Sequence, residues 1–413
     1  MQRSVSHGNS VKSAFLIMIM IIMTQVGYLD LINSPRTGND SFDEESSVME
    51  TGGSGSSQSN FTASVEGADL IIDEAMTNIT FQYNASAASG SGSGSGSVSG
   101  SGSSSSSSFA YANNKVSAGQ GDHTCAILDN GDLKCWGQDE FGELGNGGSN
   151  TNTNAPSSTA IDLGTGRTAG AVSAGTMYTC AILDNGDLKC WGRNQFGQLG
   201  DGANTDTNAP SSTAIDLGTG RTAVAVSAGF GHTCAILDNG DLKCWGWDIA
   251  GQLGNGGSNT NTNAPSSTAI DLGTGRTAVA VSAGSTYACA ILDNGELKCW
   301  GGDNQGRLGN GGSTGSINAP SSTAIDLGTG RTAVAVSAGS ESHTCAILDN
   351  GELKCWGSDV DGQLGDGWPK TDTDAPSSTA INLGTGRTAV AVSTGHSHTC
   401  AILDNGDLKC WGE

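Results

Sequence analysis

Cysteine is the residue type whose number and spacing point most directly to chemistry in this chain. The 413 residues include 12 cysteines, which fall into six pairs with nine residues between the two members. Structural zinc sites usually bring their ligands in closer pairs, about two to four residues apart, and no cysteine is left outside the pairs to act as a nucleophile. The spacing therefore favours disulfides over zinc, in the pairs Cys125–Cys135, Cys180–Cys190, Cys234–Cys244, Cys289–Cys299, Cys345–Cys355 and Cys400–Cys410.

The sequence between the two cysteines predicts the element that brings them together. Thr124 to Leu128 and Leu133 to Trp136 are apolar, β-prone runs, and the turn sequence Asp-Asn-Gly separates them. With a three-residue loop, whose glycine takes the left-handed conformation, Cys125 lies directly opposite Cys135 in a β-hairpin. Opposed residues have Cβ atoms about 4.5–5.5 Å apart, which a disulfide closes with little movement. A two-residue Asn-Gly turn would instead place the cysteines on a diagonal.

This hairpin occurs six times, so the chain is a repeat protein. The first cysteines of successive hairpins are 55, 54, 55, 56 and 55 residues apart. A typical unit has an Ala-Val-Ala-Val-Ser-Ala strand before the hairpin, and a Gly-rich loop and the segment Ala-Pro-Ser-Ser-Thr-Ala-Ile-Asp-Leu-Gly after it. We expect that segment to form a fourth, outer strand, because proline suits a sheet edge. The pattern predicts an all-β fold, a β-propeller of about six four-stranded blades over residues 109–413; a linear β-solenoid is the structural rival.

The first 29 residues carry the pattern of an export signal. A basic flank with Arg3 and Lys12 precedes an apolar run from Ala14 to Met23, which is typical of a secretory signal. The run is short for a membrane span, yet no good small-x-small cleavage site follows it, so an uncleaved membrane anchor remains the alternative. Six disulfides independently favour an oxidising compartment. We therefore expect an extracellular or cell-surface protein.

Residues 30–108 have the composition of a flexible stalk. The segment is acidic and rich in Gly and Ser, and residues 89–108 contain almost nothing else; such sequences behave as flexible coils. A patch at residues 61–83 has some β character but is too short for a core of its own. Acceptor sequences for N-glycosylation lie in this region at Asn39, Asn60, Asn78 and Asn84.

The repeat resembles that of the regulator of chromosome condensation family. The resemblance rests on His-Thr-Cys-Ala-Ile-Leu-Asp-Asn-Gly-Asp-Leu-Lys-Cys-Trp-Gly followed by Gly-Gln-Leu-Gly-Asp/Asn-Gly, and it extends through all six units. It implies a β-propeller, commonly seven-bladed in that family. The chain departs from the family pattern in having six hairpins, in ending at Glu413 before the outer strand of the last unit, and in carrying a cysteine pair in every unit.

The charge balance argues against the role of the family's eponymous member, a nuclear guanine-nucleotide exchange factor that docks on chromatin. The chain has 41 acidic and 18 basic residues, a formal net charge of −23. Nucleic-acid partners need a basic footprint, so we expect no nucleic-acid partner. A strongly negative net charge helps to keep a secreted protein soluble.

Differences between the near-identical repeats indicate where a ligand could bind. Two stretches vary most, one just before the hairpin and one just after its Trp-Gly. Both lie at the open end of the hairpin, so in a propeller they converge on one face. Aromatic and arginine side chains are the usual anchors of binding patches, which gives the hypothetical binding set Phe141, Arg193, Phe196, Phe230, Trp247, Ile249 and Val360. Drift of recent duplicates in unconstrained loops is the competing explanation.

Other recurring residues have simpler structural interpretations. One tryptophan per unit predicts a core between blades, and an arginine in Leu-Gly-Thr-Gly-Arg-Thr predicts a turn or a blade-to-blade ion pair. A histidine that Tyr178 and Tyr287 replace in two units suggests a shared packing or hydrogen-bonding role, not metal ligation. Asp366, Asp372 and Asp374 lie in an oxygen-rich loop of the kind that suits calcium, but the spaced pattern of a calcium loop is missing. We expect no metal and no cofactor.

The sequence contains no nucleophile elbow, no phosphate loop before a helix and no His/Glu metal motif. We therefore expect a binding or adhesion module, not an enzyme, that presents the variable face to an extracellular protein or glycan and meets a membrane only through an uncleaved N-terminal segment. The alternative is a secreted propeller enzyme acting on a polysaccharide or peptide, which clustered carboxyl groups of raised pKa on that face would favour. A duplicate without function, or a gene fragment, is the remaining interpretation.

Overall fold

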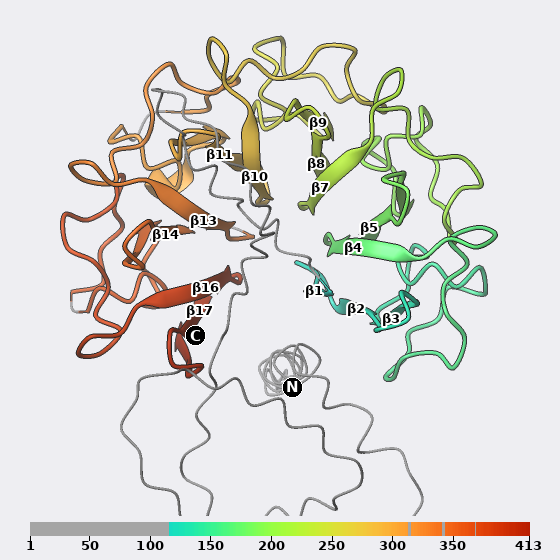
Figure 1. The fold of residues 1–413 in the computed structure, drawn as a ribbon, viewed down its shortest axis with the longest axis horizontal. Coiled ribbons are helices and arrows are strands. Elements are labelled where there is room, and N and C mark those ends of the chain that lie inside the picture. The colour runs from blue at the N-terminus through green and yellow to red at the C-terminus, as the bar shows by residue number, and fades with distance from the viewer. Residues whose placement is uncertain (1–114, 313–314, 341–342, 368) are drawn as a thin grey trace, which may run out of the picture. The chain divides into compact units, whose positions relative to one another are not determined.

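The computed structural model describes residues 115–312, 315–340, 343–367 and 369–413. Within these residues, six antiparallel three-stranded sheets follow one another along the chain. They lie around a common centre with the first strand of each sheet innermost (Figure 1), so the predicted all-β propeller is confirmed. The predicted signal or anchor, stalk, β patch and glycosylation acceptors all lie outside the described residues.

Each sheet consists of an inner strand and the two strands of a hairpin. The inner strands are β1 (Val116–Ala118), β4 (Ala169–Ala174), β7 (Ala223–Ala228), β10 (Ala278–Ala283), β13 (Ala333–Ala338) and β16 (Ala389–Thr394). The first hairpin strands are β2 (His123–Ile127), β5 (Tyr178–Leu183), β8 (His232–Leu237), β11 (Tyr287–Leu292), β14 (His343–Leu348) and β17 (His398–Leu403). The second hairpin strands are β3 (Leu133–Gly137), β6 (Leu188–Gly192), β9 (Leu242–Gly246), β12 (Leu297–Gly301), β15 (Leu353–Gly357) and β18 (Leu408–Gly412).

The described ranges hold one further element, the short 3-10 helix η2 (Asn304–Gly306). Within the same ranges, no helix has the length and apolar character needed to cross a membrane.

The predicted hairpin register is confirmed. Cys125 lies opposite Cys135 in the strand pairing, Leu128 N–H donates to the carbonyl of Asp132 at 2.8 Å, and Gly131 has a φ of 84°. The three-residue loop therefore forms with its glycine in the left-handed conformation. The same register recurs in the other sheets, and all twelve cysteines are paired within their own hairpins.

The predicted fourth strand is wrong in detail. After each of the first five hairpins the chain returns past the outer hairpin strand, but it makes only an isolated bridge there, such as Gly137 with Thr153. A backbone hydrogen bond from Ile161 to Leu133 follows later. Between these two points Pro156 has no N–H to donate, and its polar neighbours are exposed. A continuous ladder therefore cannot form, and the blades are three-stranded.

One backbone carbonyl in each loop between hairpins holds the next sheet. The carbonyl of Gln198 accepts hydrogen bonds from the indole Nε1 of Trp245 at 3.0 Å and from the hydroxyl of Thr233 at 2.8 Å. Gly200 follows in this loop with a φ of 74°, and a Cβ there would lie 2.4 Å from the indole nitrogen. The equivalent carbonyls belong to Glu143, Gln252, Arg307 and Gln363. The predicted inter-blade role of tryptophan is confirmed, and the indoles of Trp191, Trp245, Trp300 and Trp356 are fully buried.

Apolar cores lie between consecutive sheets. The face of the fifth sheet that carries Cys345 and Ile347 packs against Ala401 and Leu403 of the sixth. In the sixth sheet the equivalent face lacks a cover among the described residues, and most of β18 is partly or fully exposed. Five such clusters are found in the described part of the chain, and they join its six sheets in a row.

In four of the sheets, the side chain that opens the hairpin also forms a hydrogen bond with the next sheet. The Nε2 of His123 lies 2.9 Å from the hydroxyl of Thr179, which itself donates to the carbonyl of Glu143. Since a hydroxyl has one hydrogen to donate, the imidazole must donate from Nε2. Tyr178 and Tyr287 reach the next sheet through their hydroxyls in the same way. The predicted shared hydrogen-bonding role of histidine and tyrosine is confirmed.

One unit breaks this pattern, and it yields a stability prediction. In the fourth sheet Ala288 replaces the threonine that His123 and His343 contact from other sheets, and the buried imidazole of His232, the equivalent histidine of the third sheet, has no side-chain partner for either nitrogen. We predict that Ala288→Thr raises the free energy of unfolding by about 1 kcal/mol, because the new hydroxyl can donate to Gln252 and accept from His232. Urea unfolding measures the change.

Ala288→Val is the matched control, since valine has nearly the shape of threonine without its hydroxyl. We expect the valine variant to be no more stable than the wild type, because it leaves the imidazole of His232 unpaired. Equal stabilisation by valine and threonine would show that space filling, not the hydrogen bond, is responsible.

Burial of the histidines predicts a pH dependence of stability. Burial lowers the pKa of His343 from 6.5 to about 4, and the charges of His398 and His396 add to this. At pH values between these two pKa values, the imidazole binds a proton in the unfolded state but not in the folded state. The free energy of unfolding therefore falls as the pH falls. Tyrosine occupies the equivalent position in two other sheets. We predict that His343→Tyr gains roughly 1–3 kcal/mol relative to the wild type between pH 7 and pH 4.

Urea unfolding of both proteins at each pH measures this difference. Burial raises the pKa of Asp248 to about 6, and that carboxyl favours the folded state as the pH falls. Its contribution is common to both proteins and cancels in the comparison. A stability difference that stays constant from pH 7 to pH 4 would contradict the prediction.

Candidate functional site

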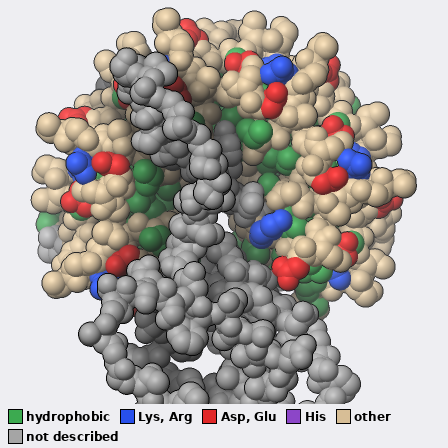
Figure 2. All heavy atoms as spheres, in the orientation of Figure 1, with side chains coloured by type: hydrophobic (Ala, Val, Ile, Leu, Met, Phe, Trp, Pro, Cys, Tyr) green, Lys and Arg blue, Asp and Glu red, His purple; other side chains and the backbone are tan. Residues whose placement is uncertain are grey.

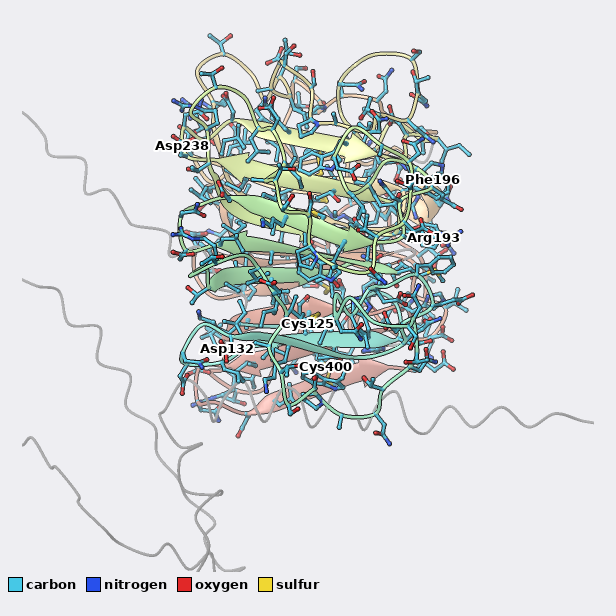
Figure 3. All side chains as sticks on the ribbon, turned by 90° about the vertical axis from the view of Figure 1, so that its right-hand side faces the viewer. Cys125, Asp132, Arg193, Phe196, Asp238 and Cys400 are labelled. Carbon is cyan, nitrogen blue, oxygen red and sulfur yellow. A yellow bond between two sulfur atoms is a disulfide. The ribbon has the colours of Figure 1, made fainter. Side chains whose placement is uncertain are left out.

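The two ends of the sheets differ in how they vary from unit to unit. Figure 3 places Asp132 and Asp238, which belong to hairpin turns, at one end, and Arg193 and Phe196 at the other. At the turn end, an arginine pairs with an aspartate of the turn in five sheets at 3.2–3.4 Å. Figure 2 views the molecule from this end, and basic side chains lie directly beside acidic ones there. An ion pair forms, but not between blades as predicted, because the arginine just before the inner strand and the aspartate of the hairpin turn belong to the same sheet. This end is the same from unit to unit.

At the other end, two positions from neighbouring blades meet. The fifth residue after the tryptophan of one blade lies beside the second residue after the tryptophan of the next blade. The pairs that show this contact are Phe141 with Arg193, Phe196 with Trp247, and Ala250 with Gly302. Because the loop carbonyl fixes each loop on the next sheet, the same two positions face one another at successive junctions.

Three aromatic side chains gather at the junction of the second and third sheets. The rings of Phe196 and Trp247 are stacked with centroids 5.1 Å apart and an interplanar angle of 18°. The ring of Phe230 lies 5.6 Å from Trp247 at 44° and is 38% exposed. Gly231 makes room for this cluster, because a Cβ there would lie 2.9 Å from Cδ2 of Phe196. Met177 and Thr286 occupy the equivalent position in the neighbouring units.

An arginine continues this cluster onto the first sheet. The guanidinium of Arg193 lies over the ring of Phe141, 4.7 Å from its centroid. It donates to the sulfur of Met177 at 3.1 Å and to Oε1 of Gln195 at 2.6 Å. The aromatic–arginine strip, as we call this surface, consists of Phe141, Arg193, Phe196, Phe230 and Trp247, and each of these side chains is partly exposed.

The structure brings together five of the seven residues predicted to bind. Ile249 and Val360 are not part of the strip; they occupy the fourth position after the tryptophan and are 63% and 66% exposed. The predicted set omitted Gly231, Met177 and Gln195. Each lies in one of the two variable stretches, so a signal existed, but a glycine or a neutral polar residue does not resemble a binding anchor.

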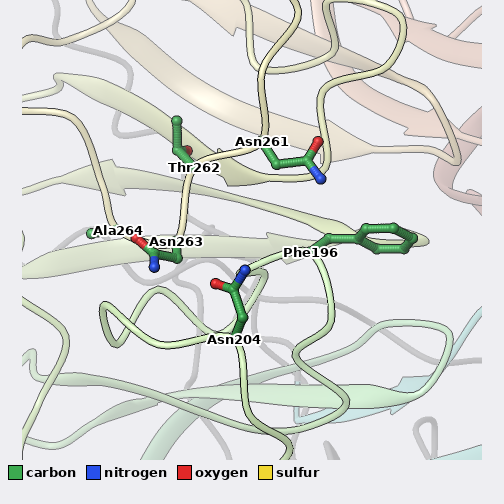
Figure 4. A pocket seen from close by; sticks show the side chains of 6 residues that line it. All are labelled: Phe196, Asn204, Asn261, Thr262, Asn263 and Ala264. Atoms are coloured by element: carbon green, nitrogen blue, oxygen red, sulfur yellow. The ribbon is translucent and has the colours of Figure 1, made fainter.

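A shallow pocket of about 370 Å³ borders the strip. Figure 4 shows its lining by Phe196, Asn204 and residues 261–264, with the phenylalanine ring turned away from the asparagines. Two of these amides already hold the loops, because Asn261 accepts the N–H of Asp248 and Asn263 donates to Gly202. The pocket is therefore a rigid polar margin of the strip.

Carboxyl groups of raised pKa are present at this end, but they are spread over the blades. Burial raises the pKa of Asp248 to about 6, and it also raises those of Glu143, Asp303 and Asp359. The three aspartates each accept the N–H of a leucine five residues later, at 2.9–3.2 Å, and Glu143 accepts the N–H of Phe141 at 2.8 Å. These carboxyl groups therefore anchor the loops that form the blade junctions.

No metal centre is found among the residues described. In these ranges no three His, Cys, Asp or Glu side chains are placed to hold an ion. Asp372, one of the three aspartates considered for calcium, accepts the N–H of Asp359 at 2.8 Å. Asn152 and Asn261 accept the equivalent N–H groups in other blades, so this position needs only a side-chain oxygen.

Curated relatives share the repeats at moderate identity. The chain is 29% identical over 292 residues to the ultraviolet-B receptor UVR8 of Arabidopsis thaliana, which covers 70% of this chain and 63% of UVR8. It is 30% identical over 247 residues to the human E3 ubiquitin-protein ligase HERC2, which covers 60% of this chain and 5% of HERC2. The chain thus spans less than two thirds of the length of either relative.

Solved structures show the same fold. Human WBSCR16 is similar with a TM-score of 0.62 and 21% identity, covering 72% of this chain and 75% of that chain. Prp20p of Saccharomyces cerevisiae has a TM-score of 0.60 and 19% identity, covering 72% and 71%. At these identities the likeness concerns the fold.

The family assignment rests on the sequence as well. The sequence model of the RCC1-like domain matches residues 92–413, a range that includes all six hairpins. The resemblance drawn from the hairpin motif is confirmed, and the chain belongs to the RCC1-like domain family.

Proposed function

We propose that this protein is an exported binding module whose ligand contacts the aromatic–arginine strip. The observation that carries the proposal is the asymmetry of the strip. The same two positions meet at successive blade junctions, yet aromatic rings occur only at the first two. Ala250 and Gly302 meet at the third junction, and Gln305 and Ser358 occupy the equivalent positions at the fourth. The fold therefore does not require the rings.

The strip also has the physical character of a binding surface. The protein itself holds its rings in place: Phe196 stacks on Trp247, Phe230 packs against Trp247 at a tilt, and Phe141 lies beneath Arg193. Preassembly lowers the entropy that binding must remove, and aromatic and arginine side chains dominate the energetics of interfaces. The buried carboxyl groups support binding over catalysis, because each is held within its own loop by a backbone N–H.

Export is part of the proposal because of the cysteines and the first 29 residues. Six hairpin disulfides persist in oxidising compartments and are rare in the cytosol. A basic flank and a short apolar run at the N-terminus agree with that compartment. The extracellular protein or glycan expected from the sequence is thus the class of ligand to screen.

Gly231→Met tests the strip without removing any of its side chains. Methionine is the natural residue at this position in the second unit, so we expect the sheet to tolerate it, while its Cβ would force Phe196 away from Trp247. The probes are a displayed library of random peptides and an array of immobilised glycans. Binding that the wild type shows should fall about tenfold or more in the variant.

Val360→Ala is the control, since it removes an exposed apolar side chain at the same end but in the fifth sheet. We expect it to leave binding unchanged. If Gly231→Met and Val360→Ala bind every recovered ligand as the wild type does, the strip is not the contact surface. The urea-unfolding midpoints of the two variants show whether either effect comes from lost folding.

Intact mass tests the oxidised state. We predict that full-length protein secreted from a eukaryotic host is lighter than its fully reduced form by twelve hydrogens, two for each of the six disulfides. Alkylation without prior reduction should then modify no cysteine. Free thiols in the secreted protein would contradict the proposed compartment and reopen the interpretation of the cysteines as zinc ligands.

A further inference from the structure

We infer that the strip takes a peptide segment in which a carboxylate lies next to an apolar side chain, and that Arg193 receives the carboxylate. This inference rests on the proposed function of the strip and adds the chemistry of its ligand. It follows from how Arg193 differs from the other arginines, from the donors that it has left, and from the shape of the aromatic cluster.

Among the described residues, Arg193 has no carboxylate within ion-pair distance. Five other arginines, one in each of the second to sixth sheets, pair with turn aspartates: Arg167, Arg221, Arg276, Arg331 and Arg387. Arg307 is 3% exposed and bonds the carbonyl of Gly302 and the hydroxyl of Thr286. Arg193 is partly exposed, and its neighbours Phe141, Met177 and Gln195 are all neutral.

An unpaired arginine is unusual in a chain with 41 acidic and 18 basic residues, because carboxylates are abundant. The guanidinium has five N–H donors, and two of its contacts go to the sulfur of Met177 and the amide oxygen of Gln195. The remaining donors are available to a carboxylate, which a guanidinium can bind through two parallel hydrogen bonds. The ring of Phe141 beneath it and the bond to Gln195 hold the group in place.

The rest of the protein limits the size of the anion. A net charge of −23 disfavours a polyanion such as a nucleic acid or a sulfated polysaccharide, because many of its charges would come close to the protein's carboxylates. A single carboxylate next to neutral groups meets much less of this repulsion, because exposed charges beyond about 8 Å are screened at physiological salt. The single cation at the strip therefore suits one acidic side chain.

The aromatic cluster favours an apolar side chain beside that carboxylate. Phe196 covers one side of Trp247 by stacking, and Phe230 packs against the same indole at a tilt. The ligand thus meets an irregular cluster, in which Phe230 is the most exposed ring, and not one open ring on which a sugar could lie flat. Arg193 and Phe196 come from one loop and lie at the same end in Figure 3, so neighbouring residues of one peptide can reach both.

Selection from a displayed library of random twelve-residue peptides on the disulfide-bonded full-length protein tests this inference. We expect the recovered sequences to be enriched in Asp or Glu next to Leu, Phe or Trp. A synthetic peptide of the consensus should lose about tenfold in affinity when its acidic residue is replaced by the corresponding amide. Calorimetry or surface plasmon resonance at 0.15 M salt measures the affinities.

Variants of the protein locate the carboxylate contact. Arg193→Gln should weaken the consensus peptide about tenfold, whereas Arg221→Gln should not, although both change the net charge equally. Arg193→Lys keeps the charge but loses the planar fork, so we expect an intermediate loss. The amide form of the peptide should bind the wild type and Arg193→Gln alike, since neither pair then has the ionic contact.

The outcomes separate this inference from the function on which it depends. If binding is sensitive to Gly231→Met but not to Arg193→Gln, the strip binds a ligand, but the inferred contact between Arg193 and a carboxylate is wrong. Neutral peptides, or neutral glycans that bind independently of Arg193, would overturn the inference in the same way. If binding is sensitive to neither variant, both the proposed function and the inference are wrong.

Discussion

The structure depends on one repeated interaction, the backbone carbonyl in each loop that accepts a hydrogen bond from an indole of the next sheet and, except at Gln252, a second one from a threonine hydroxyl. At Gln198 these come from the indole of Trp245 and the hydroxyl of Thr233, all in a buried environment. A buried carbonyl that lost these donors would be left unpaired, at a cost of about 1–3 kcal/mol. The carbonyl can be reached only because Gly200, which follows it in the loop, has no side chain. This explains why tryptophan and the Leu-Gly-x-Gly sequence recur together in every unit that has a following sheet.

The same interaction also brings residues that vary between the units together on one surface. By fixing each loop on the next sheet, it sets the fifth residue after one tryptophan beside the second residue after the next. Whatever occupies those two positions must then meet, and at two junctions the occupants are Phe141 with Arg193 and Phe196 with Trp247. The packing between blades thus brings residues that vary from unit to unit into contact at one end of the sheets.

The two ends of the sheets also differ in how their charged side chains are paired. At the turn end, arginines and aspartates neutralise one another in partly exposed pairs, each of which contributes little to stability. At the variable end, Arg193 contacts the neutral side chains of Phe141, Met177 and Gln195. An acidic protein with one accessible, preoriented cation beside apolar rings can select for a local feature of a ligand while repelling polyanions in general.

Much of the fold was set by the sequence alone, because its information is local. The nine-residue gap and the Asp-Asn-Gly turn define the hairpin register, and they placed Cys125 opposite Cys135 correctly; the period of the cysteines predicted the blades. The prediction of a fourth, outer strand was wrong because such a strand needs a continuous ladder of hydrogen bonds, which Pro156 interrupts. Only the tertiary structure decided which variable residues meet, since the contacts between Phe196, Gly231 and Trp247 join consecutive blades that lie tens of residues apart along the chain. Such contacts depend on the inter-blade carbonyl. The recurring tryptophan indicated a contact between blades, but no local pattern showed that its indole binds this carbonyl.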